Sequence, residues 1–211
     1  LADKAFEAVR SVRALARERS EEPLVELDEI VSLSFGVMSC LLRCATPIAP
    51  TTSAFQSIDS CLQGISETRD RCNYLTEAER QASTEAEGLL RELLKMLQID
   101  NPKANAVHDL AAKRPDMLLI CPDRRLIPDL ESVYAASVTR TLAGYEDDAR
   151  TKSGAIIPGW FGKDRMASLL IPPVAPSMHL VLYGIEQGWY SGFRREKQRG
   201  REARAARSHR Q

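Results

Sequence analysis

The sequence predicts an α/β protein in which a helical N-terminal half is followed by a small parallel three-layer sheet. Two patterns lead to this prediction. Up to residue 98, apolar residues recur every three or four positions, which is the period of an amphipathic helix. From residue 102 onward, short apolar runs alternate with helical segments, as in parallel strands joined by right-handed crossovers. We therefore divide the chain into a helical region (1–98), an α/β region (99–193) and a basic tail (194–211).

The first half is expected to form helices over residues 2–19, 24–45, 54–70 and 77–98. Each segment has an apolar stripe, and proline residues or charged turns separate the segments. Their Glu and Asp residues fall on the solvated faces, and this half contains no histidine. We expect it to be structural or to bind a partner rather than to catalyse a reaction.

The second half contains apolar runs that suit strands, with helical segments between them. The expected strands cover 117–121, 154–157 and 178–183, and the expected helices cover 102–114, 128–142, 164–170 and a segment from about 185. Asp164 has the side chain to cap the helix over 164–170. Three strands are few for a stand-alone sheet, so we expect this half to lean on the helical half or on chain outside residues 1–211.

Composition and charge are those of an ordinary globular protein of 211 residues, with 44% hydrophobic and 27% charged residues. The 29 basic and 29 acidic residues balance, so any attraction to nucleic acid must be local. The chain has no signal-peptide pattern and no apolar run near the roughly 20 residues that span a bilayer. We expect a cytoplasmic protein without a membrane partner. Its start without an initiator methionine suits a piece of a longer protein.

The cysteines point to a reducing compartment and to no metal site. There are five of them, Cys40, Cys44, Cys61, Cys72 and Cys121. They form no C-x-x-C pair and are odd in number, which argues against a disulfide framework and against structural zinc. Cys40 and Cys44 would share a helix face, where we expect them to pack in the core.

The candidate site lies at the carboxyl ends of the expected strands, where ligands of open α/β sheets usually bind. The turn after 154–157 carries Trp160, Lys163 and Arg165, and the strand over 117–121 is followed by Asp123 and Arg124. We assign Lys163 and Arg165 to phosphate, and Asp123, Arg124 and Trp160 to the rim of the site. The alternative is a turn that only connects a strand to a helix.

Motifs for catalysis are missing from the sequence. Gly154 and Gly159 have the glycine spacing of a phosphate-binding P-loop, but Trp160 stands where the lysine should be. No G-x-S-x-G elbow accompanies the three histidines. We therefore name no catalytic residue and no cofactor.

The tail is the most basic stretch of the chain. Its basic residues are Arg194, Arg195, Lys197, Arg199, Arg201, Arg204, Arg207 and Arg210, against Glu196 and Glu202. Such a run can bind the phosphates of DNA or RNA through salt-sensitive contacts, and the aromatic residues Trp189, Tyr190 and Phe193 just before it could stack on bases. The alternative is a solvated helix end whose aromatic residues pack on the sheet.

Several short patterns in residues 100–190 carry a resemblance. The helix over 89–97, Asn101-Pro-Lys103 opening a second helix, and a strand ending in Cys121-Pro-Asp-Arg124 resemble the beginning of the second RecA-like domain of superfamily 1 and 2 helicases. Ile156-Ile-Pro-Gly-Trp160, Arg165-Met166 with Leu169-Leu170, and Leu180-Val-Leu-Tyr183 with Glu186 and Trp189 are similar to helicase-like proteins of bacterial anti-phage islands, of the DrmE type found with DISARM systems.

This resemblance implies a RecA-like or Rossmann-like sheet and a helicase-like role in phage defence. It also implies nucleic acid and other subunits of a defence complex as partners. ATP and magnesium would enter only with a P-loop domain that precedes this chain. A second interpretation is a non-catalytic interaction or scaffold module of a multi-subunit complex, in which the helical half holds the partner.

Overall fold

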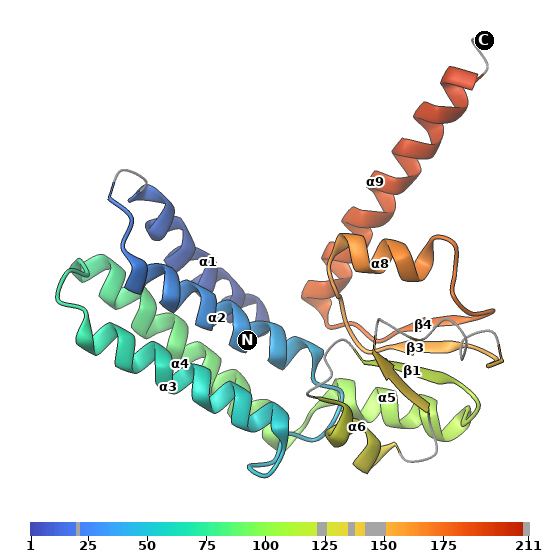
Figure 1. Ribbon diagram of the computed structural model, residues 1–211, viewed down its shortest axis with the longest axis horizontal. Helices are drawn as coiled ribbons and strands as arrows, with labels where there is room; N and C mark the ends of the chain where they lie inside the picture. The colour runs from blue at the N-terminus through green and yellow to red at the C-terminus, as the bar shows by residue number, and fades with distance from the viewer. Residues whose placement is uncertain (20–21, 122–125, 135–137, 142–150, 209–211) are drawn as a thin grey trace.

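The computed structural model describes residues 1–19, 22–121, 126–134, 138–141 and 151–208, except for the side chains at 138–141 and 201–208. Figure 1 shows a bundle of long helices beside a small sheet that is flanked by further helices. The last helix starts beside the bundle and runs outward from the sheet.

The bundle is built from the predicted amphipathic segments. Its helices are α1 (Ala2–Glu18), α2 (Val25–Arg43), α3 (Ser53–Arg71) and α4 (Glu77–Ile99). They pack chiefly as the pairs α2 with α3 and α1 with α4. Leu27, Ile30, Leu41, Ile58 and Leu90 are completely buried between them. The predicted bounds are confirmed to within two residues.

One prediction about the helical half is wrong, because two of its carboxylates are buried rather than solvated. Glu79 is 3% exposed and Glu87 is 7% exposed. Glu79 closes a capping box with Thr76 at the start of α4, and its Oε1 lies 2.6 Å from Nε of Arg19, the C-cap residue of α1. Buried charges persist where they are paired and hydrogen-bonded, and both residues meet that condition.

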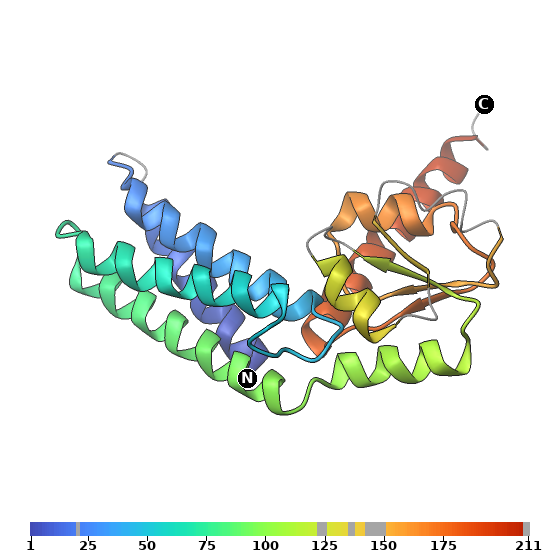
Figure 2. The same cartoon turned by 60° about the horizontal axis from the view of Figure 1, so that its bottom comes forward.

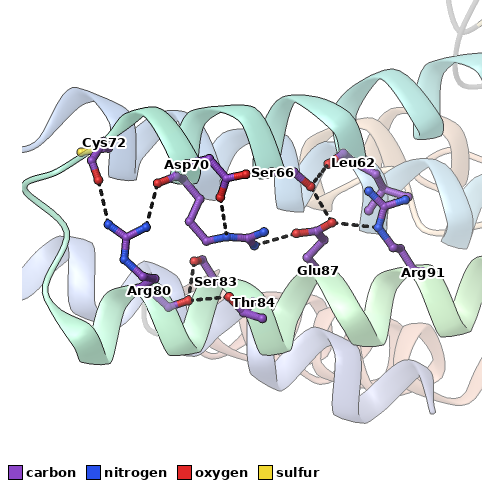
Figure 3. Close-up of polar contacts among 10 residues, drawn as sticks. Leu62, Ser66, Asp70, Cys72, Arg80, Ser83, Thr84, Glu87 and Arg91 are labelled. Carbon is purple, nitrogen blue, oxygen red and sulfur yellow. Dashed lines mark hydrogen bonds and ion pairs between the residues drawn. The ribbon is translucent and has the colours of Figure 1, made fainter.

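Glu87 joins α3 to α4 through a polar network (Figure 3). Its carboxylate accepts hydrogen bonds from Ser66 Oγ (2.7 Å), Arg69 Nη1 (2.6 Å) and Arg91 Nε (2.8 Å). Burial alone would raise the pKa of Glu87, but the hydrogen bonds from Ser66, Arg91 and Arg69 outweigh it and hold the pKa below 4.5. Arg80 closes the same end of α3 by donating to the carbonyls of Arg69 and Cys72.

The second half is a parallel sheet with helices on both faces. Its elements are α5 (Pro102–Lys113), β1 (Leu118–Cys121), α6 (Ile127–Val133), β2 (Val138–Thr141), β3 (Ala155–Ile157), α8 (Lys163–Leu170), β4 (Met178–Leu180) and α9 (Gly184–Ser208). The strand order is β2-β1-β3-β4, and every neighbouring pair is parallel. The runs predicted at 117–121 and 178–183 thus both flank β3, as the fold prediction requires.

The continuous apolar run of β1 reflects burial on both faces of the sheet. Leu119 and Cys121 belong to the core that includes α5, α6 and the bundle. Leu118 and Ile120 belong to a second core with Met166 and Leu169 of α8. Figure 2 shows α5 and α8 on opposite sides of the strands. The α/β class is therefore confirmed.

Two details of the predicted second half are wrong. The helix expected over 128–142 ends at Val133, and Val138–Thr141 forms a fourth strand beside β1. Three of these four residues are β-branched, which favours an extended backbone once β1 offers a partner. Asp164 is not the cap of α8, because Gly162 occupies the N-cap position and Asp164 lies in the first turn.

Within the part of the chain that the structure describes, no helix is long and apolar enough to cross a lipid bilayer.

The Glu87 network predicts a pH-dependent contribution to stability. We expect Glu87→Gln to lower the free energy of unfolding at pH 7 by about 1–3 kcal/mol, because charged hydrogen bonds are removed. The folded-state pKa lies below 4.5, so this contribution is fully present above about pH 4.5 and is lost as the pH falls through the lower folded pKa. Urea unfolding of both proteins between about pH 7 and pH 3 measures the difference, which should shrink in acid.

The matched control is Glu92→Gln, an exposed carboxylate on the same helix. Its effect should stay within about 0.5 kcal/mol at every pH. A Glu87→Gln difference that is the same at all pH values would contradict the assignment.

Candidate functional site at the carboxyl edge of the sheet

The candidate site lies where the carboxyl ends of β1 and β3 meet the end of α2. In the order β2-β1-β3-β4, the chain moves from β1 to β2 on one side and then to β3 on the other side. Ligands of open α/β sheets usually bind at such a reversal, outside the carboxyl ends of the strands. The loop after β3 and the start of α9 lead to this edge, and the bundle covers it.

A buried ion pair occupies the edge. Lys103 Nζ lies 2.6 Å from Glu186 Oε2, and each side chain is 1% exposed. Lys103 also donates to the carbonyl of Leu42 at the end of α2 and lies 4.4 Å from the ring centroid of Tyr183. This position suits a cation, because the carbonyl end of a helix carries partial negative charge.

Glu186 ties two loops to the same cluster. Its Oε1 accepts the backbone N–H of Trp160 (2.7 Å), and its Oε2 accepts the backbone N–H of Tyr183 (2.8 Å) in addition to Lys103. Tyr183 directly precedes α9, so Glu186 also acts as the carboxylate of a half capping box. The segments after β3 and β4 are therefore fixed by one carboxylate.

Lys103 has a perturbed pKa without access to solvent. Burial lowers its pKa below 10.5 and outweighs the opposite effect of Glu186. A group with a shifted pKa at the edge of a sheet is often functional, but structural ion-pair networks also shift pKa values. Lys103 is 2% exposed and bonded on both sides, which agrees with a structural ion pair at the edge.

The carbonyls that follow α2 are bound by other side chains of the α/β half. Asn101 Nδ2 donates to the carbonyls of Cys44 (3.2 Å) and Thr46 (3.0 Å), and the Tyr134 hydroxyl donates to the carbonyl of Ala45 (2.5 Å). Asn101 Oδ1 accepts from the Tyr183 hydroxyl at 2.9 Å. The two halves thus share one hydrogen-bonded junction.

The start of α3 is bound in the same way. Both oxygens of Asp129, on α6, accept backbone N–H groups of α3, from Ser53 (3.1 Å) and from Ala54 (3.0 Å). A helix start attracts anions through its free N–H groups and its dipole. Here the anion is a carboxylate of the chain itself.

Two hollows open beside the junction. A pocket of about 180 Å³ is lined by residues that include Phe6, Phe35, Arg43, Trp160, Glu186 and Trp189. A larger groove of about 820 Å³ runs between α2 and α3 and shares Ser39 and Arg43 with the pocket. The pocket lies at the edge where the sheet meets the bundle, whereas the groove lies on the bundle and reaches Leu126 of the α/β half.

Among the predicted site residues, Trp160 reaches this edge. Its indole is half-buried, 5.6 Å from the ring of Phe193. Lys163 and Arg165 are exposed on α8, and Lys163 pairs with Glu196 of α9 at 2.6 Å. The predicted rim residues Asp123 and Arg124 lie outside the described residues.

The basic tail continues α9. Arg194, Arg195 and Arg199 are exposed, whereas the side chains of Arg201 and Arg204 lie outside the described part. Two of the aromatic residues before the tail pack inward. Phe193 is 3% exposed, and Trp189 lies 5.2 Å from the ring of Phe6.

The residues that build the junction are not predicted by the sequence patterns. Lys103 and Glu186 are 83 positions apart, and neither differs in local pattern from a solvated charge. The sequence does carry one indication of where these residues lie. Pro102, at the first position of α5, and Glu186, three residues after Tyr183, both indicate the start of a helix.

Comparison with known proteins gives no assignment: no protein-family model matches the chain, and neither a curated protein nor a solved structure is found to be similar. Within the described residues, no group of three or more His, Cys, Asp or Glu side chains is placed to hold a metal ion.

The buried pair should behave as a coupled unit. We expect Lys103→Met and Glu186→Gln each to lower the free energy of unfolding by about 3–5 kcal/mol, because each leaves the other charge unpaired in the interior. The double variant should lose less than the sum of the two. Urea unfolding of the four proteins tests this. Lys163→Met, in an exposed pair, is the control and should change stability little. Additive losses would show that the two charges do not interact.

Gly159 should resist substitution for two reasons. It has φ of 153°, and a Cβ there would lie 3.2 Å from Glu186 Oε1 and 3.4 Å from Lys103 Nζ. We expect Gly159→Ala to lower the free energy of unfolding by about 1–3 kcal/mol. The matched control is Gly162→Ala, where φ is 94° but no atom lies within 4 Å of the new Cβ. Equal losses in the two variants would mean that crowding against the ion pair contributes nothing.

Proposed function

We propose that this chain is a helicase-like, nucleic-acid-associated domain of a bacterial phage-defence protein, related to the second RecA-like domain of helicases. The observation that carries the proposal is the course of α9. The edge strand β4 of a parallel sheet leads directly into this long helix, and its distal part, which carries the basic residues, extends away from the body (Figure 1). A three-layer RecA-like arrangement agrees with helices on both faces of the sheet.

The electrostatics of α9 favour a polyanionic partner. Arg194, Arg195, Lys197 and Arg199 are all exposed. The acidic residue among them, Glu196, is paired with Lys163 at 2.6 Å, and this contact lowers the pKa of Glu196 and keeps it ionised. Arginine and lysine on one exposed helix bind phosphates by releasing condensed counterions.

A pocket beside α9 adds a surface of matching character. It measures about 310 Å³ and is lined by residues that include Leu170, Tyr190, Arg194 and Lys197. The Arg194 guanidinium lies 5.9 Å from the ring centroid of Tyr190. Tyr190 is half-buried and lines this pocket, so its ring can contact a base beside bound phosphate.

The second candidate is a non-catalytic interaction or scaffold module of a defence complex. The observation that favours it is the Lys103–Glu186 pair, which fills the edge where open α/β sheets usually bind ligands. In the first candidate, by contrast, ATP and magnesium would enter only with a P-loop domain that precedes this chain. ATP hydrolysis by the full-length parent, with and without DNA, separates the two candidates. A parent without turnover that co-purifies with another subunit is a scaffold.

The role of α9 predicts a defined loss of nucleic-acid binding. The variant Arg194→Glu/Arg195→Glu/Arg199→Glu should bind labelled DNA and RNA at least about tenfold more weakly than the unaltered chain. The slope of log affinity against log salt should fall by about 0.7–0.9 for each phosphate that the variant no longer binds. Fluorescence anisotropy at several salt concentrations measures both quantities.

The matched control reverses the same number of charges on the bundle. Lys4→Glu/Arg17→Glu/Lys95→Glu changes three exposed residues of α1 and α4 and should keep most of the affinity. Equal weak binding by both variants and the unaltered chain would remove α9 from the proposal.

A further inference from the structure

Beyond Phe193, α9 is a free-standing helix. Every residue from Arg194 to Gly200 is exposed, although this stretch covers about two turns. The backbone continues as a helix to Ser208, and Figure 1 shows this part of α9 running away from both the bundle and the sheet. All sides of the helix are therefore open to a partner that surrounds it.

The exposed stretch carries an excess of positive charge. Its basic residues are Arg194, Arg195, Lys197 and Arg199. Two of them lie over the rings of Tyr190 and Phe193, and Arg195 donates to a backbone carbonyl, so these contacts leave each positive charge in place. The acidic residue of the stretch, Glu196, is bound to Lys163 of α8. The following residues add Arg201, Arg204 and Arg207 against Glu202.

The basic residues lie around the helix rather than on one face. A helix turns by about 100° per residue, so Arg195, Lys197 and Arg199 follow Arg194 by about 100°, 300° and 140°. A single strand contacts one side of a helix, and a membrane surface also needs an apolar face. The apolar residues between 194 and 208 are three alanines and a glycine. This distribution instead suits a groove with phosphates on both of its walls.

The major groove of B-form DNA matches the helix in size. An α-helix with its side chains is about 10–12 Å across, and the groove is about 12 Å wide. Residues 194–208 form a helical part about 22 Å long, which is enough to reach both walls. The minor groove, at about 6 Å, is too narrow, and the major groove of duplex RNA is too deep and narrow for a helix.

We propose that residues 194–208 of α9 bind in the major groove of duplex DNA, with the basic side chains on the phosphates of both walls. This inference rests on the proposed function, because it assumes that α9 binds nucleic acid, and it names the form of nucleic acid that is bound. The Tyr190 ring lies at the body end of this part and meets a base only where the duplex is open.

Three labelled ligands of one sequence test the groove: a short DNA duplex, the corresponding RNA duplex and the single DNA strand. We expect the full chain to bind the DNA duplex at least about tenfold more tightly than each of the others, by fluorescence anisotropy at constant salt. The RNA duplex is the decisive ligand, because it is also a charged double helix but has no groove that admits α9. Methylation by dimethyl sulfate should be blocked at guanine N7, in the major groove, and not at adenine N3, in the minor groove.

Two variants separate helix docking from simple charge attraction. Gly200→Pro keeps every charge but breaks the helix within its basic part, because proline lacks the N–H and clashes with the preceding turn. We expect this variant to bind duplex DNA about tenfold more weakly than the unaltered chain. Gly200→Ala is the matched control and should bind at least as tightly, since no atom lies within 4 Å of the new Cβ. Residue 200 is exposed, so urea unfolding of the body should be the same in both variants.

Three results would overturn the inference: an RNA duplex or single strand that binds as tightly as the DNA duplex, protection of adenine N3 in place of guanine N7, or equal binding by the Gly200→Pro and Gly200→Ala variants. If the Arg194→Glu/Arg195→Glu/Arg199→Glu variant still loses binding, α9 binds phosphates without entering a groove, and the proposed function stands. If that variant binds as tightly as the unaltered chain, the proposed function fails and this inference fails with it.

Discussion

The backbone carbonyls at the end of α2 need hydrogen-bond donors, and the α/β half supplies them. Lys103, Asn101 and Tyr134 donate to the carbonyls of residues 42 and 44–46. A helix end that is buried without partners is costly, so the bundle and the sheet stabilise each other at this point. The position of every candidate site residue along the edge follows from that junction.

The junction also determines what the edge can do. Glu186 lies in the first turn of α9 and is bound to Lys103 of α5, which also donates to the Leu42 carbonyl of α2, so the start of α9 is tied to the bundle through Lys103. The basic residues of α9 therefore lie on a helix whose first turn is anchored in the junction. The Lys103–Glu186 pair at the centre of the edge is sealed from solvent. Ligand-binding surfaces can therefore lie beside the pair without contacting its charges.

Periodicity was sufficient to predict the bundle and the parallel strands, because each segment carries its own apolar pattern. It failed at Val138–Thr141, where four residues are too few to show a period and the partner strand decides the conformation. Trp160 was predicted from its place after a strand. The sequence did not predict roles for Lys103, Glu186 and Phe6, because their partners lie more than 80 residues away along the chain. Asp123 and Arg124 stay predictions.

The carboxylate of Asp129 on the first N–H groups of α3 has a consequence for biosynthesis. During translation, the N-terminal part of a chain leaves the ribosome first. N-terminal units therefore generally fold before the units that follow them in the sequence. The helices of the bundle pack on one another, so we expect the start of α3 to form before α6 leaves the ribosome. We therefore expect the crossover between β1 and β2 to dock on a preformed helix end during translation, in a position that aligns the first parallel pair of strands.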